Sequence, residues 1–570
     1  MAVTTKSHEL RESSRALGIA SRLARTFSGP GLVIGTVFFA LSLTPSLLPR
    51  SAFIQGLVSG LSFAVGYGLG ALGHGIWHYL ELRAAPRRLT RAVRLAMAVT
   101  CALTAAFFLW QASAWQDSIR ALMDMEPSEG TRPFTVGLIA VAIFAVVLLL
   151  ARLFRLVAAA VSRFLSRYVP RRVSLLVGVL VAAVAFWSIA AGVLAHWVLS
   201  VVDASFQRVD ALMEPEREQP QDWLRSGSPA SVVEWEDLGR AGREFIAGGP
   251  TRADLREFFG EDVAAPIRVY VGLNSAETVE ERSRLALAEL ERAGAFERSV
   301  LVVITPTGTG WVDPNAIDTL EYLHRGDIAS VAVQYSYLAS MFALLLEPDR
   351  GAETAQALFA DVYDHWTRLP HDRRPALYLH GLSLGALHSD HSFSVYDVMG
   401  DAFQGILWSG PPFRSETWRW ATARRAPGSP AWLPRFRDST IIRFTDQHDR
   451  LGIPGVPWGP LRIAFLQYAS DPITFFEPSM AYRPPEWMAP PRGADVTPEL
   501  RWIPIVTMLQ VMFDMRGGDI TPLGHGHNFA PADYIDAWLA LTEPTGWTEL
   551  EIGRLKALFA TRGAVDESAP

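Results

Sequence analysis

The sequence predicts an α-helical transmembrane bundle followed by an α/β domain with a mostly parallel sheet and flanking helices. The first observation behind this prediction is charge. Residues 1–202 carry 19 Lys and Arg against 7 Asp and Glu, and residues 203–570 carry 33 against 51, which gives the net charge of −6. A basic apolar half joined to an acidic polar half is typical of a membrane module attached to a soluble domain. The acidic half repels phosphates, which argues against a nucleic-acid partner.

The second observation is a set of long apolar stretches in the basic half. A helix needs about 20 apolar residues to cross a bilayer, and a helix pairs all of its backbone groups within one segment. Five stretches meet that length, and we expect a transmembrane helix in each of them: roughly 31–49, 53–80, 92–115, 134–154 and 173–202.

The loops between these stretches predict the direction of crossing. Arginines crowd the N-terminal tail and the loops after the second and fourth stretches. The loop after the third stretch instead carries Asp117, Asp124, Glu126 and Glu129. The positive-inside rule then places the N-terminus in the cytoplasm. Five crossings put everything after about residue 202 on the outer side of the membrane.

The third observation is the alternation of strand-like and helix-like segments after residue 266, a pattern that predicts a parallel sheet covered on both faces. The predicted organisation is a cytoplasmic tail (1–30), a five-span transmembrane domain (31–202), a linker with short helices (203–265) and a catalytic domain (266–570). We expect strands at 267–272, 299–305, 329–335, 375–380, 404–409, 440–445 and 462–468, and helices at 277–293, 352–368, 384–390 and 531–542.

One short motif in the last domain indicates chemistry. An apolar strand runs into Gly381-Leu382-Ser383-Leu384-Gly385, which a helix-competent stretch follows. Gly-x-Ser-x-Gly in that setting is the nucleophile elbow of α/β-hydrolases. The serine sits at a strained turn, and the glycines let the backbones pass closely. We interpret Ser383 as a catalytic nucleophile in an α/β-hydrolase domain.

A serine nucleophile needs a base, and the base needs an acid that orients it. In this fold both follow the serine along the chain. Two histidines precede the last predicted helix, and we favour His527 as the base, with His525 as the alternative. Two aspartates follow predicted strands, and we favour Asp471 as the acid, with Asp449 as the alternative.

Ester cleavage also needs amide donors for the developing oxyanion. We expect the amide of Leu384 in this role, together with one from the glycine-rich loop after strand 299–305, at Thr307 or Gly308. We expect no metal and no cofactor. A single cysteine, Cys101, excludes a disulfide framework, a cysteine-based zinc site and an iron–sulfur cluster.

Residues 475–516 are rich in aromatic residues, prolines and methionines. A lid or a membrane-facing cap has this composition, and so does an insertion that covers the edge of the sheet.

Seven motifs spread over nearly the whole chain are specific in combination: Ser42-Leu-Thr-Pro-Ser-Leu-Leu-Pro49-Arg50, Thr305-Pro-Thr-Gly-Thr-Gly-Trp311, Gln334-Tyr-Ser-Tyr337, His380-Gly-Leu-Ser-Leu-Gly385, Gly410-Pro-Pro-Phe413, Gln467-Tyr-Ala-Ser-Asp-Pro472 and Gly524-His-Gly-His527. With these motifs the chain resembles bacterial membrane-anchored α/β-hydrolases that carry a multi-span N-terminal domain. The resemblance implies a serine-hydrolase fold and favours Asp471 over Asp449. It implies no particular substrate.

The predicted function is that of a membrane-anchored serine hydrolase that cleaves an ester in a lipid or an acylated envelope molecule. We expect it in a bacterial inner membrane, with the catalytic domain on the periplasmic side and the lipid bilayer as its partner. The alternatives are an acyltransferase with the same nucleophile and a non-catalytic scaffold or transport-associated protein. No predicted span carries a charge near its centre, which argues against ion-coupled transport.

Overall fold

The computed structural model describes residues 27–82, 87–128, 133–189, 210, 212–214, 217–338, 340, 343, 349–518 and 521–567. The chain divides into a helical unit (Met1–Ala190, Glu477–Pro485 and Val496–Gly517) and an α/β unit (Ala191–Phe476, Glu486–Asp495 and Gly518–Pro570). The predicted order of a helical part and an α/β part is therefore confirmed. However, Glu477–Pro485 and Val496–Gly517, which we call the insert, belong to the helical unit although they lie within the predicted catalytic domain.

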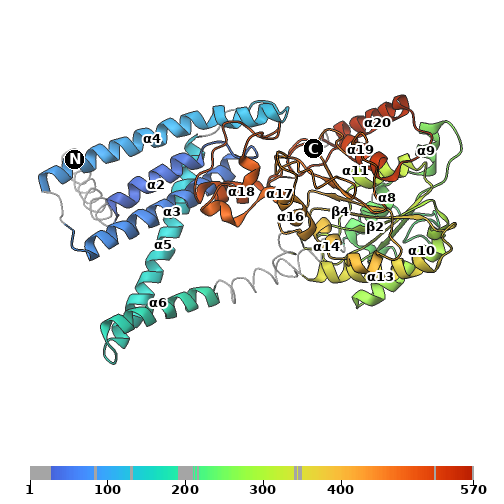
Figure 1. The fold of residues 1–570 in the computed structure, drawn as a ribbon. Coiled ribbons are helices and arrows are strands. Elements are labelled where there is room, and N and C mark those ends of the chain that lie inside the picture. Colours follow the sequence, from blue (N-terminus) through green and yellow to red (C-terminus); the bar gives the residue numbers. More distant parts are fainter. Residues whose placement is uncertain are drawn as a thin grey trace, which may run out of the picture. The chain divides into compact units, whose positions relative to one another are not determined.

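The helical unit is built from long helices that pack side by side in the order α4-α2-α3-α5-α6 (Figure 1). Helix α2 contacts α3 and α4, α3 contacts α5, and α5 contacts α6. Glycines of α3 permit the close approach, because a Cβ at Gly66 would lie 2.7 Å from the Ile34 carbonyl oxygen. The helices are α2 (Gly29–Ser42), α3 (Ala52–Tyr79), α4 (Arg87–Leu122), α5 (Pro133–Leu165), α6 (Arg171–Trp187) and, in the insert, η4 (Pro478–Ala481) and α18 (Val506–Asp514).

Among the described residues, three helices are long and apolar enough to cross a membrane: Ala52–Tyr79, Ala92–Leu122 and Pro133–Leu165. The first predicted span, 31–49, is wrong in length. Helix α2 has 14 residues, about 21 Å at 1.5 Å per residue, because Pro45 disfavours helical backbone at the residue before it. The fifth predicted span, 173–202, forms α6 in its first part, and its part from residue 190 lies outside the described residues.

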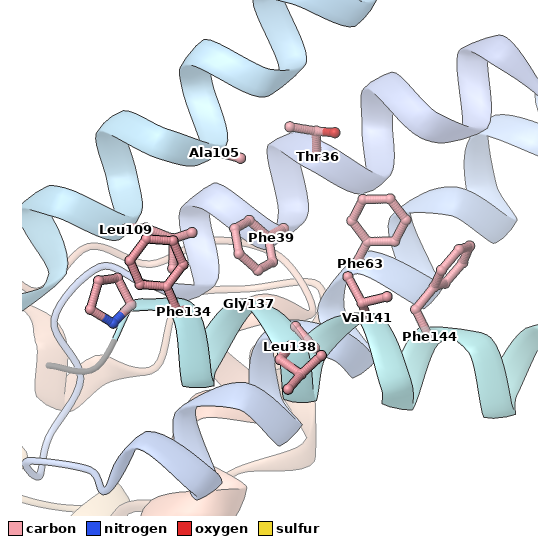
Figure 2. Close-up of a pocket in the computed structure, with 12 residues that line it drawn as sticks. Thr36, Phe39, Phe63, Ala105, Leu109, Phe134, Gly137, Leu138, Val141 and Phe144 are labelled. Carbon is pink, nitrogen blue, oxygen red and sulfur yellow. The ribbon is translucent and has the colours of Figure 1, made fainter. Parts of the chain in front are cut away.

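An apolar pocket of about 490 Å³ lies within the helical unit. Figure 2 shows phenylalanine rings of α2, α3 and α5 around it, together with Leu109 of α4. The hydroxyl of Thr36 lines the pocket, but it donates to the Leu32 carbonyl oxygen at 2.8 Å. The pocket therefore suits hydrocarbon and offers little to a polar solute.

The α/β unit contains a seven-stranded sheet in the order β1-β3-β2-β4-β5-β7-β6, with every neighbouring pair parallel. The predicted fold class is confirmed, and each strand lies within a few residues of its predicted position. Strands this fully buried read as continuous apolar runs, which is why the sequence located them. The strands are β1 (Ile267–Val271), β2 (Val300–Thr305), β3 (Ile328–Val333), β4 (Ala376–Leu382), β5 (Gly405–Ser409), β6 (Ile442–Thr445) and β7 (Arg462–Leu466).

Helices pack on this sheet as two groups. In the first group, α13 (Arg350–Arg368) contacts both α10 (Val279–Ala293) and α14 (Leu384–Asp390), and the three helices contact β1 to β4. In the second group, α11 (Pro314–Leu323) and α19 (Pro531–Thr542) contact each other, and α19 also contacts β5 and β7. The other elements are α8 (Gly239–Gly248), α9 (Arg252–Phe259), α15 (Val395–Val398), α16 (Glu416–Ala423), α17 (Pro472–Phe475), α20 (Glu549–Glu567), η2 (Glu236–Leu238), η3 (Ala295–Glu297) and η5 (Glu486–Met488).

The segment predicted as a linker, 203–265, is partly built into the α/β unit. The Ser226 amide donates to the Arg268 carbonyl oxygen at 3.1 Å, and the Ser226 hydroxyl accepts from the Tyr270 amide at 3.1 Å. These bonds pair backbone groups of β1, which lies at the edge of the sheet. Unpaired backbone N–H and C=O groups of an edge strand cost free energy when they are buried. This segment pairs some of them and so covers the β1 edge of the sheet.

Candidate active site

Ser383 occupies the turn between β4 and α14. Its backbone angles are φ 55° and ψ −123°, a conformation that costs free energy for a residue with a side chain. The crossing is tight on both sides of the serine. A Cβ at Gly381 would lie 2.5 Å from the Gly385 carbonyl carbon, and a Cβ at Gly385 would lie 2.2 Å from the Thr305 carbonyl oxygen. Only glycine fits at these two positions, so Gly-x-Ser-x-Gly here forms a strained strand-to-helix turn.

Asp471 and His527 form a buried pair. The imidazole Nδ1 lies 2.7 Å from Asp471 Oδ2, and the carboxylate is fully buried. The carboxylate also accepts from the Ile473 amide at 2.8 Å and from the Thr474 hydroxyl at 3.0 Å. An ionised carboxylate only accepts hydrogen bonds, so Nδ1 carries the proton and Nε2 of the neutral ring is left as an acceptor.

The imidazole of His527 lies over the end of β5, the strand beside β4. A Cβ at Gly410 would come 2.4 Å from His527 Cε1. The preceding residue, Ser409, accepts a hydrogen bond from the Ser383 amide at 2.9 Å. The ring nitrogen Nε2 is buried and makes no hydrogen bond within the described part of the chain. The serine and the Asp471–His527 pair thus lie at the carboxyl ends of neighbouring strands.

Comparison with protein families gives two matches. Residues 267–555 match a model described as the alpha/beta-hydrolase family, and residues 43–250 match a model described as the N-terminus of that family. The chain belongs to the alpha/beta-hydrolase family. No curated protein and no solved structure matches it.

The sheet order of this alpha/beta-hydrolase distinguishes the two aspartates considered for the acid. Asp471 follows β7, which pairs with β5, whereas Asp449 follows β6 at the outer edge. Asp449 Oδ1 accepts from the Leu451 amide at 2.9 Å, as a turn aspartate does. Of the two histidines considered for the base, His527 is the one whose imidazole is hydrogen-bonded to Asp471. His525 lies in the turn before it, where its carbonyl oxygen accepts from the Thr521 hydroxyl at 2.6 Å.

The loop expected to supply an oxyanion donor is already hydrogen-bonded. The Thr307 amide donates to the Trp311 carbonyl oxygen at 3.0 Å, and the Gly308 amide donates to the Ser340 hydroxyl at 3.2 Å. Either amide would have to leave its acceptor in order to bind substrate. The Leu384 amide differs, because the first amide of a helix has no acceptor within the helix.

Three residues that the sequence did not single out hold the histidine loop of this alpha/beta-hydrolase. Ser470 donates its hydroxyl proton to Asp495 at 2.6 Å and accepts from the Gly526 amide at 2.9 Å. Gln447 donates to Asp495 Oδ2 at 3.1 Å and to the Gly524 carbonyl oxygen at 2.9 Å. Ser470 lies within the Gln467–Pro472 motif, but nothing local in the sequence indicates its partners, because these residues act through contacts between distant segments. Among the described residues, no group of three or more His, Cys, Asp or Glu side chains is placed to bind a metal ion.

Asp313, also missed from the sequence, begins α11 beside the 307–311 loop. It is buried, and its carboxylate accepts from the Asn315 amide at 2.9 Å. Burial raises the pKa of the Asp313 carboxyl to about 7, and the hydrogen bond from the Asn315 amide acts in the opposite direction. The folded protein therefore holds a proton on Asp313 over a pH range in which the unfolded chain has lost it.

This pKa predicts a pH-dependent stability. The native state binds the Asp313 proton more tightly than the unfolded chain does. The stabilisation that this proton gives to the folded state is therefore fully present below about pH 4 and is lost as the pH rises to about 7. Asp313→Asn keeps the helix cap and removes the titration. We expect the melting temperature of the variant minus that of the wild type to increase from pH 4 to pH 7. A constant difference over this range would contradict the assignment.

Proposed function

We propose that this protein is a membrane-anchored serine hydrolase that cleaves an ester in a lipid or an acylated envelope molecule. The observation that carries the proposal is the strained Ser383 at a strand-to-helix turn, with the buried Asp471–His527 pair at the end of the neighbouring strand. Membership of the alpha/beta-hydrolase family supports a hydrolase fold. Three helices long and apolar enough to cross a membrane support a substrate that lies in or beside the bilayer.

In the proposed mechanism, Ser383 Oγ attacks the ester carbonyl carbon while His527 Nε2 takes the hydroxyl proton. Asp471 stabilises the imidazolium that forms. The Leu384 amide donates to the oxyanion of the tetrahedral intermediate. When the intermediate collapses, the alcohol leaves with the proton from His527, and an acyl group remains on Ser383. Water then attacks the acyl-enzyme while His527 removes a proton from that water. His527 returns this proton to Ser383 Oγ as the acid is released, which restores the free enzyme.

The nucleophile is tested by a fluorophosphonate probe, which reacts with an activated serine whatever the natural substrate. We expect the full-length protein in detergent to be labelled and Ser383→Ala to lose all labelling, because the attacking oxygen is gone. Ser389→Ala is the matched control, since Ser389 is a buried serine on α14, the short helix that follows Ser383. A well-folded wild type that takes no label, or labelling that survives in Ser383→Ala, contradicts the proposal.

The acid is tested by a pair of identical substitutions. Asp471→Asn keeps the side-chain shape but no longer holds the Nδ1 proton of His527, and we expect labelling and ester hydrolysis to fall by about 10⁴-fold, the size of effect seen at a serine-protease triad. Asp449→Asn changes a turn residue and should leave both rates near those of the wild type. Equal losses in the two variants, or a loss only in Asp449→Asn, would overturn the assignment of Asp471.

We also propose that the protein lies in a bacterial inner membrane with its catalytic unit on the periplasmic side. Arg163 at the end of α5, Arg167 in the connection and Arg171 at the start of α6 make this turn basic, whereas the connection between α4 and α5 is acidic. The positive-inside rule favours the cytoplasm for the first and the outside for the second.

The insert supports the same orientation. Its residue Asp514 forms an ion pair with Arg50 at 2.6 Å, and the Arg50 amide donates to Gln116 Oε1 at 2.7 Å. Gln116 lies at the end of α4 that leads into the acidic connection. A segment from the catalytic part of the sequence is therefore held at the acidic end of the helices. This argument does not depend on how many spans precede it.

The orientation is tested with single cysteines in a Cys101→Ser background. We expect Glu126→Cys, in the acidic connection, to react with a membrane-impermeant maleimide on intact spheroplasts. Tyr168→Cys, in the basic connection, should react only after the membrane is permeabilised. Both side chains are exposed in the structure, so burial does not limit either reaction. The reverse pattern would place the catalytic unit in the cytoplasm.

A further inference from the structure

The chain between the candidate acid and the candidate base does not stay in the α/β unit. After Asp471 it contributes Glu477–Pro485 to the helical unit, returns for Glu486–Asp495, and leaves again for Val496–Gly517. It comes back at Gly518, before His527. The insert therefore interrupts the sequence between the two residues that form the buried pair.

The chain changes unit at four points between these two residues, and at three of them a residue shortly before or after the change makes a hydrogen bond at or beside the pair. Before the first departure, Asp471 caps the short helix α17 through the Ile473 amide. Before the second, Asp495 accepts from Ser470, the neighbour of Asp471, at 2.6 Å. At the final return, the carbonyl oxygen of Gly518 accepts from the His527 amide at 2.9 Å. The residues of the α/β unit that flank the insert are thus hydrogen-bonded to the neighbour of the acid and to the base.

The insert is itself fixed within the helical unit by buried polar contacts. At the end of α18, Asp514 accepts from Arg50 Nε at 2.6 Å, from the Leu47 amide at 3.2 Å and from the Ser46 hydroxyl. The side chains of Arg50 and Asp514 are 2% and 0% exposed. One turn earlier, Gln510 donates to the Thr44 carbonyl oxygen at 2.9 Å. A buried charge that loses its partner is strongly unfavourable, so the Asp514 contact holds α18 in place.

We propose that the Arg50–Asp514 ion pair is a positioning device for His527, so that the membrane unit controls whether the candidate site is assembled. The inference rests on the serine-hydrolase function proposed above. When α18 is docked, Gly518 holds the backbone of His527, and the imidazole keeps its 2.7 Å contact with Asp471. When α18 is released, the chain that leads into Gly518 is no longer anchored, although Gly518 still accepts from the Thr521 hydroxyl at 2.8 Å, and the backbone that carries the base can shift. Asp514 touches no substrate and acts only through this chain segment.

The test uses the full-length protein in detergent, with a p-nitrophenyl ester and the fluorophosphonate probe. Asp514→Asn keeps the shape of the side chain and removes its charge. We expect kcat to fall by about a hundredfold, the cost of a displacement of about 1 Å at a catalytic group, with KM nearly unchanged. Asp514→Glu keeps the charge and should restore most of the activity. The rate of probe labelling also depends on His527, so it should fall together with kcat in Asp514→Asn and recover in Asp514→Glu.

Two further variants distinguish a loss of His527 positioning from a general disturbance of the helical unit. Asp117→Asn removes a carboxylate of the same unit that accepts from the Ser128 amide at 2.9 Å and from its hydroxyl at 2.8 Å, and it should keep the wild-type kcat. Insertion of three glycines between Gly517 and Gly518 leaves the ion pair intact but slackens the connection to His527. We expect this chain to lose as much kcat as Asp514→Asn.

The outcomes are distinct. Wild-type kcat in the glycine-extended chain overturns the inference, even where Asp514→Asn does not fold, and it leaves the serine-hydrolase function standing. Equal losses in Asp117→Asn and Asp514→Asn also overturn the inference, because any change in the helical unit would then suffice. A wild-type protein that neither labels nor hydrolyses esters removes the proposed function first, and the inference with it.

Discussion

The buried carboxylate of Asp471 is the constraint on which the rest of the site depends. A charge removed from water must be matched by hydrogen bonds, and breaking such an arrangement costs about 3–5 kcal/mol. Asp471 meets this requirement with the Ile473 amide, the Thr474 hydroxyl and the ring of His527. The end of β7, the start of α17 and the histidine loop are therefore fixed together around one pair of oxygen atoms.

The sequence predicted those parts of the molecule that local physics determines. Strands β1 to β7 are short and mostly apolar, so they were visible in the sequence as short apolar runs. Gly381 and Gly385 flank Ser383 because two backbones pass within contact distance there, and that requirement leaves a motif in the sequence. Asp471 and His527, favoured from their places after a strand and before the last helix, are brought together in the structure.

The remaining features depend on contacts between distant segments, which leave no local pattern. The insert is apolar and was read as a lid, a cap or a cover for the sheet, whereas it packs in the helical unit. Asp495 and Gln447 support the histidine loop from two separate loops. The sequence predicts that the Thr307 or the Gly308 amide donates to the oxyanion. In the structure the first amide donates to the Trp311 carbonyl oxygen and the second to the Ser340 hydroxyl.

The separation of Arg50 from Asp514 in the sequence has a consequence for synthesis. The two residues are 464 positions apart, so at about 5–20 residues per second the ribosome makes Asp514 roughly half a minute to a minute and a half after Arg50. Until then the guanidinium has no carboxylate partner, and water at the membrane surface must solvate it. A nascent chain that stops early leaves this charge unmatched. The helical unit therefore cannot form its Arg50–Asp514 ion pair until nearly the whole protein has been translated.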